Sequence, residues 1–182
     1  MNRTSFFKRF ARDCRGFVSV EAVIVFPALL FIFGVGWTYF DAFRQQAVSQ
    51  KANYVIGDMI SRETASITPA YITNSQALLR HLTRAQGAEI DLRVTVVNYN
   101  ADQAGWRVVW SETRGVQPRL QDADLPDMAD RLPPGIEGEE LILVETWDVF
   151  DPVFNVGLDM FQIKSYSFTR PRHAPQVVFD NA

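Results

Sequence analysis

The sequence predicts an α+β protein, in which a long N-terminal transmembrane helix continues into an exported domain with a small antiparallel sheet of about four strands and one or two helices. Three observations predict this class. An apolar run of membrane length occupies 17–40, helical apolar spacing continues beyond it, and apolar residues then alternate with polar ones in the second half of the chain. We therefore divide the chain into a leader, a transmembrane helix, an amphipathic helical extension, an exported domain and a C-terminal tail, at 1–16, 17–40, 41–64, 65–170 and 171–182.

The leader is short and basic. Its charged residues are Arg3, Lys8, Arg9, Arg12, Asp13 and Arg15. The leader therefore carries a net charge of +4, and because the whole chain carries −3, residues 17–182 carry −7. Basic flanks stay on the cytoplasmic side of a membrane, which predicts a cytoplasmic leader and an exported C-terminal domain. The acidic balance of the exported part argues against a nucleic-acid partner.

The apolar run has the length and the flanks of a membrane anchor. As a helix, 17–40 is about 36 Å long at about 1.5 Å per residue, enough to cross a hydrocarbon core of about 30 Å with some tilt. A cleaved secretory signal would be followed by an A-x-A site, and no such site follows this run. Trp37 and Tyr39 fall at its outer end, where an aromatic belt is expected. Pro27 predicts a kink in the helix, although membrane helices also tolerate proline without a functional reason.

Glu21 is the only charged residue of the span. A carboxylate inside a membrane is costly and often functional, but one near the surface can also extend to the headgroups at little cost. The functional interpretation requires cleavage between Gly16 and Phe17, at a plausible protease site. The new α-amino group would lie four residues before Glu21 or could reach it from a neighbouring subunit, and pairing would lower the cost of the charge.

Helical spacing continues into the extension. Val48, Ala52, Val55 and Met59 recur at helical intervals, which predicts one amphipathic helix from Phe17 to about Glu63. Its apolar stripe would face the core of the domain or a partner protein. A second helix begins either at Thr68-Pro69, with proline at its first position, or at the capping box Thr73-Asn74-Ser75-Gln76, and Gly87 fits its C-terminal cap.

Four strands are expected after this helix. Apolar and polar residues alternate over 90–96, which predicts a strand, and Trp106, Val108 and Trp110 share a face of a second strand that returns as a hairpin. Leu141–Phe150 is nearly apolar throughout and so should be central. Phe161–Thr169 reads as the fourth strand. A long connection at 115–138 should hold a short helix near 125–132, and Pro171 and Pro175 mark a tail that we expect to be loosely held.

No motif for catalysis, a cofactor or a metal is present, so we expect neither an enzyme nor a small-molecule substrate. Cys14 is the only cysteine, which excludes a disulfide within one chain. With His173 as the only other histidine, His81 should face solvent. Asp148 and Asp151 could share a cation, with Glu139 and Glu140 nearby, but we interpret these acids as exposed strand ends.

Two segments together resemble the TadE-like minor pseudopilins of the tight adherence (Flp/Tad) pilus system. The first is RDCRGFVSVEAVIVFPALLFIFG, which is similar to the opening of that family. The second is the strand LILVETWDVFDPVF, followed by a short connector and a strand that closes in TRPR. The middle of the chain, 65–138, carries no matching motif. TadF-like and TadG-like proteins share the opening.

The resemblance implies a function in pilus assembly. A membrane-embedded aspartic prepilin peptidase would cut after Gly16, and Glu21 would occupy the acidic position that follows the cut. The subunit would sit in the inner membrane of a Gram-negative-type bacterium with a periplasmic domain, and it would assist or enter thin adhesive pili together with other pilus subunits and Tad assembly proteins. Major pilins of this system are very short, so this chain would be a minor subunit. The alternative is an uncleaved single-pass membrane protein whose periplasmic domain binds a ligand or the cell wall.

Overall fold

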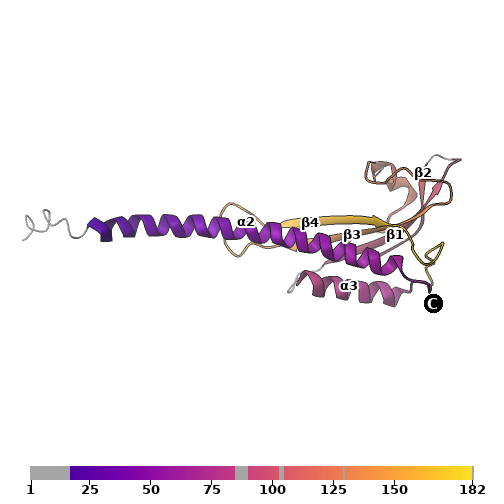
Figure 1. The fold of residues 1–182 in the computed structure, drawn as a ribbon, viewed down its shortest axis with the longest axis horizontal. Helices are drawn as coiled ribbons and strands as arrows, with labels where there is room; N and C mark the ends of the chain where they lie inside the picture. The colour runs from indigo at the N-terminus through magenta and orange to yellow at the C-terminus, as the bar shows by residue number, and fades with distance from the viewer. Residues whose placement is uncertain (1–16, 85–89, 103–104, 129, 182) are drawn as a thin grey trace, which may run out of the picture. The chain divides into compact units, whose positions relative to one another are not determined.

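The computed structural model describes residues 17–84, 90–102, 105–128 and 130–181, and the backbone alone at Phe17. It confirms the α+β class: a long apolar N-terminal helix, a second helix and a four-stranded antiparallel sheet (Figure 1). The chain divides into two compact units. The first contains the long helix up to Asp41 together with Pro152–Leu158, and the second contains Ala42–Asp151 and Asp159 onward.

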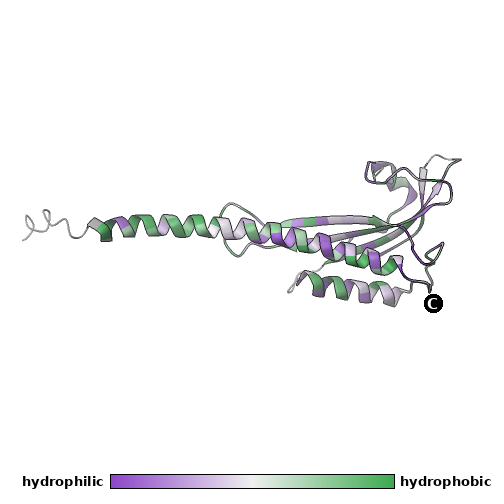
Figure 2. Cartoon of the chain, viewed as in Figure 1, coloured by the Kyte–Doolittle hydropathy of each residue, from purple (hydrophilic) through white to green (hydrophobic). Residues whose placement is uncertain are grey.

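The long helix, α2, runs from Phe17 to Ser61 over 45 residues. Its length agrees with the prediction of one helix that extends through the span and the extension. It is the one helix in the described ranges that is long and apolar enough to cross a membrane. Apolar residues dominate its first half and polar residues enter along its second half (Figure 2).

In the second unit, one stripe of α2 is buried. Ala52, Ile56 and Ile60 lie in the core at 3%, 0% and 0% exposure. Val55, expected in the same stripe, is 46% exposed, so this part of the prediction is wrong. The buried stripe continues instead through two polar residues, Ser49 and Asn53. A pattern that counts only apolar residues could not locate that face.

The second helix, α3, runs from Pro69 to Thr83 and confirms the first of the two predicted starts. Thr68 is the N-cap, and its hydroxyl oxygen accepts a hydrogen bond from the Tyr71 N–H at 3.2 Å. The hydroxyl of Thr73 instead donates to the Pro69 carbonyl, inside the helix. The helix ends at Arg84 in the left-handed conformation, with φ at 54°. Gly87, the expected cap, lies outside the described residues.

The sheet has the order β2-β1-β3-β4, with all neighbours antiparallel. Its strands are β1 (Asp91–Asn100), β2 (Gly105–Arg114), β3 (Glu140–Phe150) and β4 (Phe161–Thr169). The predicted hairpin is the β1–β2 pair, and β3 is central as its apolar sequence indicated. Of the two edge strands, β4 alternates between buried and exposed residues.

The first predicted strand is β1, and both of its faces are buried. Residues 91–97 of β1 are all buried, including Arg93 and Thr95. β1 is a central strand with a separate core cluster on each face. One cluster joins β1 and β3 to α2 and α3, and the other joins them to the connection that follows β2. Polar residues therefore lie buried on the second face, where they need partners within the protein.

A β-bulge separates the two tryptophans of β2, contrary to our prediction of a shared face. Val96 pairs with Trp110 and Val97 pairs with Val108, so Val109 is an extra residue in β2. One extra residue inverts the side-chain alternation beyond it. Trp110 consequently packs in the cluster with the helices, whereas Trp106 packs in the other cluster.

The connection 115–138 covers the second face of the sheet. In place of the expected helix near 125–132, it forms two 3-10 turns, Asp122–Asp124 and Pro126–Met128. The first turn ends before Pro126, which has no N–H with which to continue the hydrogen bonding. The connection still buries its apolar residues against the sheet, namely Leu120, Leu125, Met128 and Leu132.

The C-terminal tail is docked, which corrects the expectation of a loosely held segment. Val177 is 4% exposed and joins the helix-side core. Its carbonyl accepts a hydrogen bond from the Trp110 indole N–H at 2.7 Å, and its N–H donates to the Glu140 carboxylate at 3.2 Å. Phe179 pairs with Ile67 as an isolated bridge and lies 5.2 Å from Trp110 between ring centroids.

Candidate membrane anchor and processing site

Phe17 is the first residue of α2, and Glu21 lies one turn further along the same helix. The predicted processing residue Gly16 lies outside the described residues. Side chains four positions apart on a helix occupy the same face, about 6 Å apart along the axis at about 1.5 Å per residue. If the chain began at Phe17, its α-amino group would therefore lie about one helical turn before Glu21.

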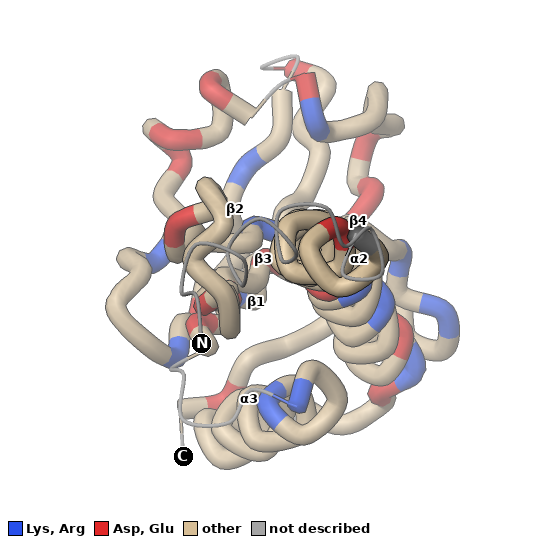
Figure 3. Tube along the Cα trace, turned by 90° about the vertical axis from the view of Figure 1, so that its left-hand side faces the viewer, with Lys and Arg blue, Asp and Glu red and all other residues tan. Residues whose placement is uncertain are grey.

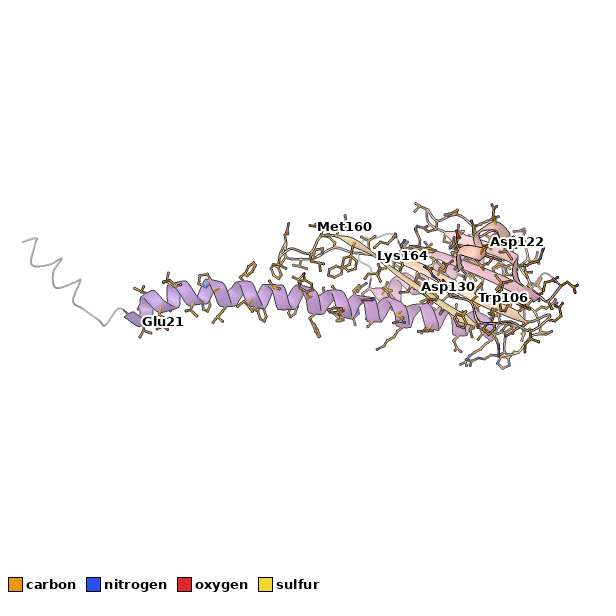
Figure 4. All side chains as sticks on the ribbon, turned by 90° about the horizontal axis from the view of Figure 1, so that it is seen from above. Glu21, Trp106, Asp122, Asp130, Met160 and Lys164 are labelled. Carbon is orange, nitrogen blue, oxygen red and sulfur yellow. The ribbon has the colours of Figure 1, made fainter. Side chains whose placement is uncertain are left out.

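Glu21 has no hydrogen bond or ion pair to any described residue. Its side chain is exposed and points away from the helix (Figure 4). Seen from the N-terminal end, α2 shows one acidic position and then uncharged turns before further charges appear (Figure 3). A partner for this carboxylate within the described chain is thus lacking, and any compensation in a membrane must come from the new terminus, a second molecule or the headgroups.

The turns that follow Glu21 present an apolar surface on all sides. Every residue from Val18 to Phe33 is exposed, with Val18 at 74% and Phe33 at 66%. A helix that is apolar all round belongs in a lipid or in the interior of a larger protein. Near the outer end, Thr38 satisfies its hydroxyl by donating to the Gly34 carbonyl at 2.9 Å, so it adds no unpaired polar group.

Pro27 lies inside α2, and the helix continues through it. Proline has no N–H, so the carbonyl of Val23 loses its usual helical donor. A kink at this position stays a prediction. A Cβ added at Gly34 or Gly36 would meet no atom within 4 Å, so neither glycine is required by a contact among the described residues.

The acids proposed as exposed strand ends are largely buried. Asp148 is 1% exposed and accepts hydrogen bonds from the Ser49 hydroxyl and the Gln45 amide, both at 2.7 Å. Asn53, one turn further along α2, donates to the Val144 carbonyl at 3.1 Å and to the Ser165 carbonyl at 3.3 Å. These contacts join α2 to β3 and β4. Only Asp151 matches the expected exposure, and the cation site has no support.

A buried ion pair lies on the other face of the sheet. The Arg93 guanidinium donates from Nε to Glu145 Oε2 at 2.6 Å and from Nη1 to the Pro118 carbonyl at 3.0 Å. Its Cζ lies 5.1 Å from the ring centroid of Trp147. The sequence contained a sign of this pair, because each charged residue stands inside a predicted strand, where a charge needs a partner. Arg93 and Glu145 lie directly opposite each other in the β1–β3 ladder. We interpret the pair as structural, because Arg93 is engaged by Glu145, by the Pro118 carbonyl and by the ring of Trp147.

Nothing in the described ranges assembles a metal site, since no group of three His, Cys, Asp or Glu side chains converges there. His81 is exposed on α3, as expected.

Two groups among the described residues have shifted pKa values. Burial raises the pKa of the Glu140 carboxyl, and the hydrogen bond that this carboxylate accepts from the Val177 N–H lowers the pKa by a smaller amount. Burial and the adjacent Glu63 carboxylate raise the pKa of Tyr71 to about 12, which keeps this phenol neutral.

Comparison with family models, curated proteins and solved structures gives no match for this chain.

Proposed function

We propose that this chain is a TadE-like minor pseudopilin, anchored in the inner membrane of a bacterium with its domain in the periplasm, and processed after Gly16 by a prepilin peptidase. The single observation that carries the proposal is the continuous helix α2. It begins at Phe17, bears a lone carboxylate one turn later, and continues from an apolar segment into the core of a sheet domain. The basic leader directly before Phe17 supplies the cytoplasmic flank.

This arrangement suits a subunit that is anchored in the membrane before it joins or assists a pilus. One helix both anchors the chain and packs on the sheet, since Ile56 and Ile60 belong to the core of the domain. The function would rest on interactions made by the helix and by the surface of the domain, with other pilus subunits and Tad assembly proteins as the partners.

The first test concerns processing. In cells that carry the peptidase, N-terminal sequencing of the protein recovered from membranes should find Phe17 as the first residue. Gly16→Leu should leave the leader attached, because a bulky side chain at the cut blocks the peptidase. Gly36→Leu is the matched control, since a Cβ there meets no neighbour within 4 Å, and it should be cut normally. Recovery of the intact Met1 start in the unsubstituted protein would refute the processing role.

The second test concerns topology. The leader carries +4, which should hold the N-terminus in the cytoplasm. A reporter that is active only in the periplasm should be active when fused after Ala182. Replacement of the four leader arginines by glutamates is the control. It should reduce the reporter activity severalfold, because it removes the positive charge that keeps the leader in the cytoplasm. Activity of a cytoplasm-only reporter at the same fusion point would show that the orientation is wrong.

The alternative function is an uncleaved single-pass protein whose domain binds a ligand. One observation favours it: a groove on the sheet is lined by Tyr99, Trp106, Pro133 and Pro134. Tyr99 and Trp106 meet edge to face, with ring centroids 5.3 Å apart. The two functions differ at the N-terminus, so the same sequencing experiment separates them.

A further inference from the structure

The connection between β3 and β4 is an apolar loop. Between Asp151 and Asp159 the chain reads PVFNVGL. Val153 is 75% exposed and Phe154 is 48% exposed. No Lys or Arg occurs from Asp151 to Ile163. A loop between two strands is ordinarily polar because it faces water, so a run of exposed apolar side chains indicates a surface that contacts something else.

This loop, Pro152–Leu158, belongs to the same compact unit as the apolar part of α2. Burial on that part of the helix is confined to one stripe near its outer end. Thr38 is only 2% exposed, although its neighbours Trp37 and Tyr39 are 53% and 42% exposed. The loop is grouped with this part of the helix, whose one buried residue among those described is Thr38, so we place the loop beside Thr38.

The position of Thr38 along the helix sets the depth of the loop. Thr38 lies about 32 Å beyond Phe17 at about 1.5 Å per residue. A hydrocarbon core is about 30 Å thick, so a span that begins near Phe17 reaches its outer boundary close to Thr38. Trp37 and Tyr39 occupy the same level, where aromatic side chains prefer to lie. The loop beside Thr38 is therefore at the height of the membrane–water interface on the exported side.

We propose that Pro152–Leu158 is a second membrane contact, in which the side chains of Val153 and Phe154 enter the boundary between headgroups and acyl chains next to the anchor. This inference rests on the proposed single-pass topology and adds a lipid-binding surface to the folded domain. The occupant is the lipid itself. Burying apolar side chains at this boundary stabilises the contact in proportion to the area removed from water.

The charges around the loop define the kind of lipid surface it prefers. Asp151 is exposed at its start and Asp159 is exposed at its end. Without a cation nearby in the sequence, anionic headgroups offer the loop no attraction. The contact is apolar, so a zwitterionic membrane is sufficient and added salt has little effect on it. Met160, which follows the loop, is also exposed at 65% and lies at the opposite end of the sheet from Trp106 (Figure 4).

A single fluorescent label tests the contact in the full chain. Cys14 is the only cysteine, so Cys14→Ser allows one new cysteine to be placed at a time. Val153→Cys is labelled with a nitrobenzoxadiazole dye, and the protein is reconstituted in phosphatidylcholine vesicles that contain a nitroxide lipid with a shallow spin label. Ile32→Cys, in the span, is the lipid reference. Val116→Cys, 80% exposed in the second unit, is the aqueous reference.

We expect the label at position 153 to be quenched by the nitroxide lipid at least about twofold more strongly than the label at 116, with a blue-shifted emission. Aqueous iodide should quench it less than the label at 116. Replacing part of the phosphatidylcholine by phosphatidylglycerol should leave the quenching unchanged. Phe154→Ser should reduce quenching at 153 by about half or more, because an apolar contact is removed. Asn155→Ser is its matched control and should have no effect.

Three results would overturn the proposal. If the label at 153 behaves like that at 116 while the label at 32 is in lipid, the loop contact is wrong and the anchor survives. If the label at 32 is also aqueous, the single-pass topology fails together with the loop. If the label at 153 is shielded from both iodide and nitroxide lipid, protein covers the loop and lipid does not.

Discussion

A Glu21→Gln variant is expected to insert and to be cleaved after Gly16, yet to lose piliation and surface adherence. The amide keeps the size of the carboxyl group and removes its charge. If the Glu21 carboxylate pairs with an α-amino group at Phe17, in its own chain or in a neighbouring subunit, the variant loses a charged hydrogen bond worth about 1–3 kcal/mol. A loss of this size lowers an assembly equilibrium by about tenfold for each 1.4 kcal/mol.

Counting pili by electron microscopy and adherent cells on a surface measures this effect. Glu21→Asp is the matched variant, because it keeps the charge on a shorter side chain and should retain part of the function. Ser19→Ala, two residues earlier and also exposed, should behave as the unsubstituted protein. A carboxylate that only extends to the headgroups predicts the opposite result, because Gln is easier than Glu to place near a membrane. Normal pili in the Glu21→Gln strain would therefore remove the assembly role of this residue.

The elements that the sequence predicted correctly are those set by local periodicity. Helix α2 runs through the span and the extension because helical residues continue without a break to Ser61. Helix α3 begins at Pro69 because a threonine cap and a proline coincide there. The strand β3 was expected to be central since it carries apolar residues on both faces. In each case a few neighbouring residues contain the whole signal.

The elements that were missed depend on contacts between distant residues. The bulge at Val109 changes the face of Trp106, and no turn residue or glycine marks it in the sequence. The tail was expected to be loosely held because it contains Pro171 and Pro175, yet Val177 is part of a core formed by other segments. Asp148 is buried because Gln45 and Ser49 satisfy it from α2, about a hundred positions away. Such partners appear only once the chain is folded.

The candidate site could be named from the sequence because its parts are adjacent in the chain. Gly16 directly precedes Phe17 in the chain, and the spacing of Phe17 and Glu21 on a helix follows from the sequence alone. The loop Pro152–Leu158 could not be assigned in this way. Its residues lie beyond the predicted strand Leu141–Phe150, and only the structure groups them in one unit with the apolar part of α2.

Glu145→Ala is expected to destabilise the domain by about 3–5 kcal/mol, because it leaves the Arg93 guanidinium buried without its carboxylate. The side chains of this pair are 10% and 7% exposed. Arg93 cannot turn to water easily, since its other contacts are the Pro118 carbonyl and the ring of Trp147. Thermal unfolding of the full chain in detergent, followed by tryptophan fluorescence, measures the loss, and Trp147 beside the pair should report it directly.

The exposed pair between Arg62 and Asp58 provides the matched control. Their nitrogen–oxygen distance is 2.8 Å, but the side chains are 58% and 40% exposed. Arg62→Ala should therefore change stability by no more than about 1 kcal/mol. The double variant Arg93→Met, Glu145→Leu should recover most of the stability lost in Glu145→Ala, because it removes both charges and keeps the volume. If Glu145→Ala is as mild as Arg62→Ala, then water reaches the Arg93 guanidinium in the variant and replaces the lost carboxylate.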